Sequence, residues 1–510
     1  MDKRQEIAII IGASPASLAA ALYLLRETNI HPIILEAKNE VGGISSTKVH
    51  KGNYIDLKSC PFVSEHKIVN DLWLSSLRAQ GKQSKDDRLL NRSVPLAKAG
   101  PDPENSDEVL LTRYKQERLM FDNKLFDWPF TLSSTNQRLL GTNRFRKAYF
   151  GYLKTKFSKH VEENYENVLI NRYGEPLYTN IYLPMSEKIF GYHPSKQTID
   201  PKIKDFSGLC LRRRLGRFLT GLFQSKKKKA EIRKKETQFY YPKLGAGQMY
   251  EAIARQILAR GGEIILNARV NKIYLERFHI NGVEYIKDGE KQTLRGDYYF
   301  SSIALSDFFE FVGPTPLNRE AYDIATKLNY RNLIKVGILV NKLAIKNETK
   351  LPSIDDNLPD TTIHFSDNVK ASSMQIYNNW SPYMVRDFQN TVWLGIHYYV
   401  SPDENFWREG DDKIIQFTVK ELRKTGLIEH NDEPLTTVVY KEDKAYPVYD
   451  QVYTNMPLIR KFTNQVDNLY CIGGSGTHRR LQMDESILSG INAVRSITNP
   501  VLYPKNNLWK

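Results

Sequence analysis

Residues 9–25, which read IIIGASPASLAAALYLL, decide the fold of this chain. An apolar run from Ile7 to Ile11 ends at a glycine, and the segment from Pro15 to Arg26 then has the composition of a buried helix. A second apolar run, Pro32 to Leu35, follows and ends at a glutamate. This order of strand, glycine turn, helix, strand and acid predicts a Rossmann-like half of an α/β domain.

The glycine turn departs from the usual three-glycine pattern, because its three places hold Gly12, Ser14 and Ser17. The first glycine makes the tight turn, the second lets the backbone approach a pyrophosphate, and the third lets the helix pack closely on the strand. A serine at the second place adds a hydroxyl that can donate to phosphates, and Ser17 affects packing more than binding. Glu36 is placed to accept from ribose hydroxyls. The pattern predicts the fold and leaves open whether a nucleotide still binds.

Length and composition limit the class of protein. A chain of 510 residues exceeds what one core supports, so two or three domains, interleaved in sequence, are expected. A hydrophobic fraction of 41% is typical of a globular protein and argues against global disorder. Cys60, Cys210 and Cys471 lack the spacing of a disulfide framework or a zinc site, so no metal and a reducing, cytoplasmic compartment are expected. The first apolar run is too short for a signal peptide, and no segment approaches the roughly 18 apolar residues of a membrane span.

The net charge of +15 is concentrated in residues 211–235, where eleven Lys or Arg and one Glu give a local excess of +10. One interpretation is a solvated basic loop or helix end. The other follows from the helical spacing of apolar residues among the arginines, which is typical of a helix lying on an anionic membrane. These residues are Leu215, Phe218, Leu219, Leu222 and Phe223. No RNA- or DNA-binding motif accompanies the segment, so a nucleic-acid partner is not expected.

Four further segments have distinct patterns. Residues 84–108 are polar and contain three prolines, which predicts an exposed loop, and residues 130–225 show helical patterns without a βαβ repeat. Aromatic and β-branched runs between residues 330 and 400 predict an antiparallel sheet. The last sixty residues end in a strand, a glycine turn, a loop and a closing helix.

A second region with strand and helix signals begins at Phe239. Its expected elements are a helix from Gln248 to Ala259, strands around Ile264 and Val270, a hairpin over Asn281 and Gly282, and a buried strand leading into a helix in the run YYFSSIAL.

Further motifs occur in the order of a known family. They are EAKNEVGGISSTKVH (36–50), RLMFDNKLFDWPF (118–130), YGEPLYTNIYLPMSEKIFG (173–191), FYYPKLGAGQMYE (239–251), SMQIYNNWSPYMV (373–385) and GSGTHRRLQMDESILSG (474–490). Together they resemble the bacterial FAD-dependent oxidoreductases of the amine oxidase and protoporphyrinogen oxidase superfamily, in the branch similar to UDP-galactopyranose mutase. The resemblance runs over nearly the whole chain.

The resemblance implies FAD as the cofactor and assigns its contacts. The pyrophosphate would face Gly12, Ser14 and the helix that contains Ser17, and the adenosine ribose would bind Glu36. The other implied contacts are Gly43 and Ser46 along the cofactor, the backbone of Val270 at the adenine, Gly473 and Gly476 on the flavin side, and Asp484 at the ribityl chain, with Met483 and Ser486 beside it. An N-cap of the last helix is the other interpretation of Asp484.

The chain also departs from the family pattern. At residues 58–60 it has Lys-Ser-Cys where the family usually has Gly-Gly-His beside the isoalloxazine, and Gly474 replaces a usual arginine. Catalytic residues stay unassigned, with Cys60, His478 and Arg479 as candidates. The changes gather around the cofactor, which indicates either altered flavin chemistry or loss of the flavin.

The substrate side is less defined. If the small-molecule substrate is a nucleotide sugar or a lipid-linked intermediate, arginines and tyrosines would clamp its phosphates. The resemblance offers Trp380, Tyr383, Tyr446 and Arg479. The same residue types serve equally as packed aromatics or a surface arginine, and both interpretations stay open.

Two functional hypotheses follow. The first is an FAD-dependent oxidoreductase, or a sugar mutase-like enzyme, that acts through flavin N5 in envelope polysaccharide or glycolipid biosynthesis. The second is a non-catalytic descendant that keeps the fold to bind a nucleotide or sugar or to act as a scaffold. In either case we expect an α/β protein in which a discontinuous FAD-binding domain (residues 1–75, 236–312 and 440–500) is interleaved with a substrate domain of helices and an antiparallel sheet (residues 76–235 and 313–439).

Overall fold

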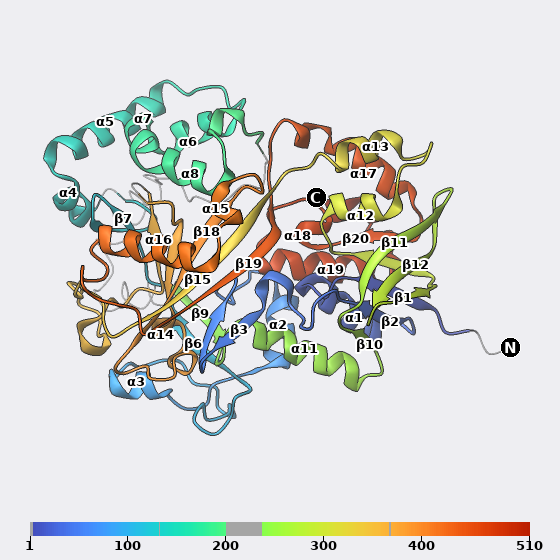
Figure 1. Cartoon of the computed structure of the whole chain (residues 1–510), viewed down its shortest axis with the longest axis horizontal. Helices are drawn as coiled ribbons and strands as arrows, with labels where there is room; N and C mark the ends of the chain where they lie inside the picture. The colour runs from blue at the N-terminus through green and yellow to red at the C-terminus, as the bar shows by residue number, and fades with distance from the viewer. Residues whose placement is uncertain (1–3, 132, 200–236, 367–368, 510) are drawn as a thin grey trace.

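A five-stranded parallel sheet, with strand order β10-β2-β1-β14-β20, forms the first layer of the molecule (Figure 1). The structure is a computed structural model and describes residues 4–131, 133–199, 237–366 and 369–509. The strands are β1 (Ile7–Ile11), β2 (His31–Leu35), β10 (Glu263–Ile265), β14 (Tyr298–Ser301) and β20 (Leu469–Cys471). They come from three distant parts of the chain, and the α/β class predicted from the first segment is confirmed. The exact domain boundaries stay a prediction.

The predicted first helix is α1 (Pro15–Glu27), which contacts both α11 (Gly247–Ala259) and α19 (Met483–Thr498). Its residues from Pro15 to Leu24 are all buried, because alanines and leucines occupy every side of it. A helix that is apolar all round needs neighbours on all sides, and here the parallel sheet and two further helices supply them.

A seven-stranded sheet forms the second layer, with order β19-β15-β18-β17-β16-β7-β8. It is antiparallel except where β16 pairs with β7, so the prediction for residues 330–400 is confirmed. The strands are β7 (Glu117–Phe121), β8 (Lys124–Asp127), β15 (Tyr330–Val340), β16 (Thr362–Phe365), β17 (Ser373–Ile376), β18 (Val392–Val400) and β19 (Thr436–Pro447).

A group of helices covers one end of this second sheet, at the upper left in Figure 1. They are α4 (Ser134–Leu140), α5 (Thr142–Phe157), α6 (Tyr165–Tyr173), α7 (Glu175–Leu177), the π-helical turn η2 (Tyr178–Tyr182) and α8 (Leu183–Phe190). Buried aromatic rings hold them together, and those of Tyr173 and Tyr182 stack with centroids 3.6 Å apart. The helical prediction is confirmed to residue 190, whereas the basic segment 211–235 lies outside the described residues.

The remaining elements connect these layers. The strands are β3 (Thr47–His50), β4 (Asn53–Asp56), β5 (Arg78–Ala79), β6 (Val109–Tyr114), β9 (Gln238–Pro242), β11 (Arg269–Glu276), β12 (His279–Lys287) and β13 (Glu290–Leu294). The helices are α2 (Lys67–Ser76), α3 (Lys85–Leu89), α12 (Leu305–Val312), α13 (Arg319–Ala325), α14 (Tyr377–Trp380), α15 (Asn405–Arg408), α16 (Asp411–Lys424), α17 (Met456–Gln465) and α18 (Gly473–Gly476). Within the ranges that the structure describes, no helix has the length and hydropathy to cross a membrane.

Two sequence predictions need correction. The hairpin between β11 and β12 turns at Arg277, which has a φ of +56°, and not at Asn281 and Gly282. Those two residues lie inside β12, where the register shifts between Tyr274 and Leu275 on the facing strand. The Asn-Gly pair therefore marks a β-bulge here. Bulges and hairpin turns favour the same residue types, so the two look alike in sequence.

Residues 84–108 are not simply an exposed loop, because they contain α3 and two buried carboxylates, those of Asp86 and Asp87. Arg113 on β6 forms ion pairs with both, at 3.2 and 3.3 Å. A polar run was misleading because its charges are paired inside the protein.

Candidate cofactor and substrate site

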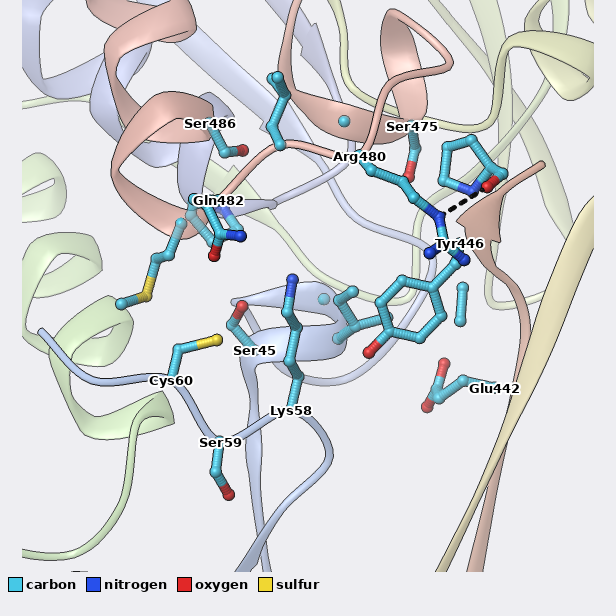
Figure 2. A pocket seen from close by; sticks show the side chains of 18 of the residues that line it. Ser45, Lys58, Ser59, Cys60, Glu442, Tyr446, Ser475, Arg480, Gln482 and Ser486 are labelled. Atoms are coloured by element: carbon cyan, nitrogen blue, oxygen red, sulfur yellow. Dashed lines mark hydrogen bonds between the residues drawn. The ribbon is translucent and has the colours of Figure 1, made fainter. Parts of the chain in front are cut away.

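A cavity of about 610 Å³ opens where the parallel sheet, the second sheet and α8 meet (Figure 2). That volume is within the range of small-molecule and cofactor sites. Of the residues singled out in the sequence, its wall contains Gly12, Ser14, Glu36, Gly43, Cys60, Trp380, Tyr446, Gly473, Arg479, Met483 and Ser486. The others lie outside this wall: Ser17, Ser46, Val270, Tyr383, Gly476, His478 and Asp484.

The turn at Gly12 requires glycine. Its φ is +89°, and a Cβ at this position would lie 2.9 Å from the Ser302 hydroxyl. Ser14 is the N-cap of α1, and its hydroxyl accepts from the Ser17 amide at 3.3 Å. Ser17 is fully buried and donates to the Ser302 hydroxyl at 2.8 Å, so it fills the place of the packing glycine with a hydrogen bond to the neighbouring strand end. The positive end of α1 therefore faces the cavity with its turn intact.

Glu36 lies at the end of β2, where its carboxylate accepts from the amides of Ala13 at 2.7 Å and Lys38 at 2.9 Å. These bonds fix the carboxylate beside the glycine turn, and its remaining lone pairs are available to hydroxyl donors. Val270 is buried in β11 two residues beyond Ala268, whose amide donates to the Glu36 carbonyl. Val270 therefore lies close to the end of β2 but behind the cavity wall.

The C-terminal motif lies opposite the first turn. Gly473 begins the short helix α18 with a φ of +69°, and a Cβ there would lie 3.2 Å from Ala16 of α1. The N-cap of α19 is Gln482, which forms a capping box with Glu485, so the N-cap interpretation of Asp484 is wrong. Asp484 lies in the first turn of α19 and accepts from the Ser64 hydroxyl at 2.7 Å. The start of α19 faces the cavity through Gln482 and Met483.

Lys58 points into the cavity between Ser45 and Tyr446, while Ser59 points away from it (Figure 2). The Lys58 ammonium lies 5.5 Å from the centroid of the Tyr446 ring. Burial raises the pKa of the Cys60 thiol, so the sulfur is protonated at neutral pH and is a weak nucleophile. The residues that replace Gly-Gly-His therefore bring a positive charge, and no activated thiol, into the cavity.

A buried lysine, Lys335 of β15, was missed in the sequence. It is fully buried and donates to the side chain of Gln375, which lines the cavity. Burial lowers the pKa of Lys335 to about 7, against the raising effect of the Asp56 carboxylate. The signal was available, because Lys335 is the one charged residue in the apolar run LIKVGILV.

A third group of polar side chains lies at the end of the cavity near β7 and β16. His364 packs against Trp128 with the ring centroids 5.2 Å apart and the rings tilted by 42°, and its Nε2 lies 3.7 Å from the Glu117 carboxylate. Burial by itself raises the pKa of Glu117, but His364 and Lys115 lower this pKa to about 2. Burial holds the pKa of His397, which pairs with Lys335 across the sheet, well below its ordinary value, so this ring is neutral.

The predicted substrate-side residues separate into two groups. Tyr446 is in the cavity wall, and its ring lies between Lys58 and Arg480, whose guanidinium carbon is 5.9 Å from the centroid. Trp380 is buried, and its indole nitrogen donates to the Thr361 carbonyl. It also forms part of the cavity wall. Tyr383 instead bonds to Glu104 at 2.7 Å, away from the cavity.

The two C-terminal candidates also differ. His478 is fully buried and donates to the Val448 carbonyl at 3.1 Å, and burial lowers its pKa to about 4. Arg479 is 6% exposed and lines the cavity. The neighbouring Arg480, which was not among the predicted site residues, donates to the carbonyls of Pro447 and Ile189.

The turns at Gly12 and Gly473 and the polar chamber around Tyr446 share one cavity. This arrangement is typical of an enzyme that binds a dinucleotide cofactor next to its substrate. The sequence matches the family model of flavin-containing amine oxidoreductases over residues 18–498. The chain therefore belongs to this family, and its cofactor is FAD.

Solved structures agree with this assignment at the level of the fold. The chain is similar to reduced UDP-galactopyranose mutase, at 15% identity over 99% of both chains with a TM-score of 0.75. It is similar to a putative protoporphyrinogen oxidase from Exiguobacterium sp. 255-15, at 15% identity over 97% and 99% of the two chains with a TM-score of 0.67. It is also similar to cyclohexylamine oxidase from Brevibacterium oxydans, at 11% identity over 98% and 100% with a TM-score of 0.61. No curated protein matches the sequence.

The residues present fit a dinucleotide. Gly12 and Gly473 leave out the Cβ atoms that would narrow the space between α1, β14 and α19. The N-terminus of α1 offers backbone amides to phosphates, and Glu36 offers carboxylate oxygens to ribose hydroxyls. FAD, when bound, supplies the hydride or electron transfer, and the chain supplies binding and orientation.

Substitution of Gly12 by alanine should release the cofactor. The variant would combine a Cβ 2.9 Å from Ser302 with a positive φ, which costs about 1–3 kcal/mol where it can be accommodated at all. We expect the purified wild-type protein to show a flavin absorption spectrum after gel filtration and Gly12→Ala to lose it. Gly289→Ala is the matched control, because Gly289 has a φ of +81° with nothing within 4 Å of its Cβ position. Retention of FAD by Gly12→Ala would contradict the assignment of this turn.

Proposed function

We propose that this FAD-dependent enzyme acts on an anionic small molecule, such as a nucleotide sugar or a lipid-linked phosphate, as a cytoplasmic oxidoreductase or mutase-like enzyme. The observation that carries the proposal is the charge of the chamber beside the cofactor-binding turns. This charge distinguishes an anionic substrate from the amines that the family name suggests.

Four carboxylates of the cavity wall are occupied by nearby donors. Glu117 is paired with Lys115 and His364, Asp307 with Lys444, and Glu442 with Lys38. Glu36 accepts from two backbone amides. The exposed Asp443 is the other carboxylate of this wall.

Three cations of the wall, Lys58, Arg479 and Arg480, have no carboxylate partner among the described residues. Two of them flank the Tyr446 ring from opposite segments of the chain. Cations without a carboxylate partner attract anions, and a guanidinium beside a phenol matches the geometry of phosphate oxygens. Within this proposal Lys335 would hold or move a proton beside the chamber, and Gln375 would orient its ammonium through the side-chain oxygen.

Arg480→Gln tests the anionic substrate. Loss of a charged hydrogen bond should weaken the binding of a nucleoside diphosphate such as UDP by about 10- to 100-fold, measured by calorimetry on the FAD-loaded protein. Arg408→Gln, at an exposed position of α15, should leave the affinity unchanged. Equal affinity of Arg480→Gln and wild type, or binding of amines in place of UDP, would contradict the proposal.

The second candidate function is a non-catalytic descendant that keeps the cavity for a nucleotide or sugar. Lys58 favours it, because a long side chain stands where the family usually has glycine next to the flavin. A purified protein that is colourless and takes up no added FAD, yet binds UDP, would support this candidate over the enzyme.

A further inference from the structure

Helix α5 exposes large apolar side chains along its outer face. Phe157 is 90% exposed and Phe150 is 64% exposed, and Val161 just beyond the helix is 74% exposed. The inner face is buried through Ala148, Tyr152 and Thr155. Large exposed apolar side chains on one helix face mark an interaction surface when they are grouped rather than scattered.

Helix geometry groups these aromatic side chains. Phe150 and Phe157 are seven residues apart, which is two turns, so they lie on one line along the helix. Arg146, Lys147 and Lys154 are exposed on either side of that line. α5 lies at the outer edge of the helical group, at the upper left in Figure 1.

Helix α5 itself carries charge of one sign, and the exposed Glu162 and Glu163 follow only after Val161. Between residues 128 and 161 the sequence has seven Lys or Arg and no Asp or Glu. Arg144 is paired with Asp122, and Lys156 lies over the Tyr152 ring. The other cations have no carboxylate partner among the described residues. An anionic partner is therefore favoured over a protein surface that carries charges of both signs.

We propose that α5 docks the protein on an anionic membrane surface, with Phe150 and Phe157 entering the interface between headgroups and acyl chains. A helix with aromatic side chains along its outer face and Lys or Arg beside them has the composition of interfacial helices. Each cation near an anionic leaflet adds attraction that falls with ionic strength. This docking does not depend on the proposed substrate.

Co-sedimentation of the full FAD-loaded chain with vesicles tests the proposal. Wild type should bind vesicles that contain phosphatidylglycerol, should not bind pure phosphatidylcholine, and should be released by salt. Phe150→Ser with Phe157→Ser should weaken binding at least about tenfold, because each phenyl ring contributes by apolar burial. Val501→Ser with Leu502→Ser is the matched control, since those side chains are 86% and 70% exposed near the other end of the chain.

A spectroscopic variant separates insertion from electrostatic attraction. Phe157→Trp should show a blue shift of its emission on adding anionic vesicles. An unshifted emission, or equal binding by the double serine variant, would overturn docking through α5, and equal binding would assign the membrane contact to another segment such as residues 211–235. Dimerisation that disappears in the double variant, without vesicle binding by wild type, would overturn it in favour of a second copy of the chain.

Discussion

Lys335→Met is expected to remove a rise in stability between about pH 7 and pH 10. Burial lowers the pKa of Lys335 from its ordinary 10.5 to about 7 in the folded protein. Between these values the unfolded chain binds a proton that the native chain does not, so the free energy of unfolding increases with pH in this window. The destabilising contribution is complete below pH 7 and is at most on the order of 5 kcal/mol.

The measurement is urea unfolding of wild type and variant across the same pH range. We expect the wild-type free energy of unfolding to rise by several kcal/mol relative to the variant, whose curve should be flatter. Lys441→Met, on the neighbouring strand β19, serves as the control, because its ammonium bonds to two carbonyls at the sheet surface. Parallel curves for wild type and Lys335→Met would contradict the lowered pKa.

The same substitution bears on function. The Nζ of Lys335 donates to the side-chain oxygen of Gln375 in the cavity wall, and the pKa of Lys335 near 7 falls where a proton carrier is effective. Once a substrate is found, the wild-type rate should change through about pH 7, and Lys335→Met should lose this limb together with about 100-fold in kcat. A variant with an unchanged pH–rate profile would assign Lys335 a purely structural role.

Arg113→Met should destabilise the protein by about 3–5 kcal/mol, because two buried carboxylates would then share Arg92 as their cationic partner among the described residues. Arg113 is 3% exposed and pairs with Asp86 and Asp87. Its Nε also donates to the carbonyl of Trp380 at 2.9 Å, which connects this ion network to the cavity wall. The free energy of unfolding, measured in urea at pH 7, should fall accordingly.

Acid provides the internal control for this variant. Although burial by itself raises it, the pKa of Asp86 is lowered in the folded protein by Arg113 and Arg92. The stabilisation is therefore present above the ordinary carboxyl pKa and is lost as the pH falls through the lowered value. The gap between wild type and Arg113→Met should narrow as the pH falls below the ordinary carboxyl pKa of 3.8, and Asp86→Asn with Asp87→Asn should recover part of the loss in the Arg113→Met background. An equal free energy of unfolding for wild type and Arg113→Met at pH 7 would contradict the account.

Local patterns predicted the elements that depend on neighbours in sequence. The strand of Ile7–Ile11, the glycine turn and α1 follow from apolar spacing and from the left-handed backbone at Gly12. The Asn281–Gly282 pair was misread as a turn, because a bulge and a turn use the same residue types and differ only in the register of the facing strand.

The site was predicted in part. Residues on the first turn and the C-terminal motif gather at one cavity, as family resemblance implied. His478, Tyr383 and Val270 lie outside its wall, since a motif fixes a residue's position along the chain and not the direction of its side chain. Lys335 and Arg480 were missed because their environment is built from strands and loops far away in sequence.

The sequence by itself determined that a parallel sheet begins at Ile7, that Gly12 makes the turn between the first strand and α1, and that residues 58–60 depart from the family pattern. These properties follow from side-chain periodicity and backbone sterics, which act over a few residues. Only the tertiary structure decided that Lys58 and Arg480 share the Tyr446 ring, that Lys335 is buried beside Gln375 of the cavity wall, and that Glu117, Asp307 and Glu442 are ion-paired. Burial and charge pairing depend on contacts between distant segments, so they set the chemistry of this cavity after the local pattern has set its fold.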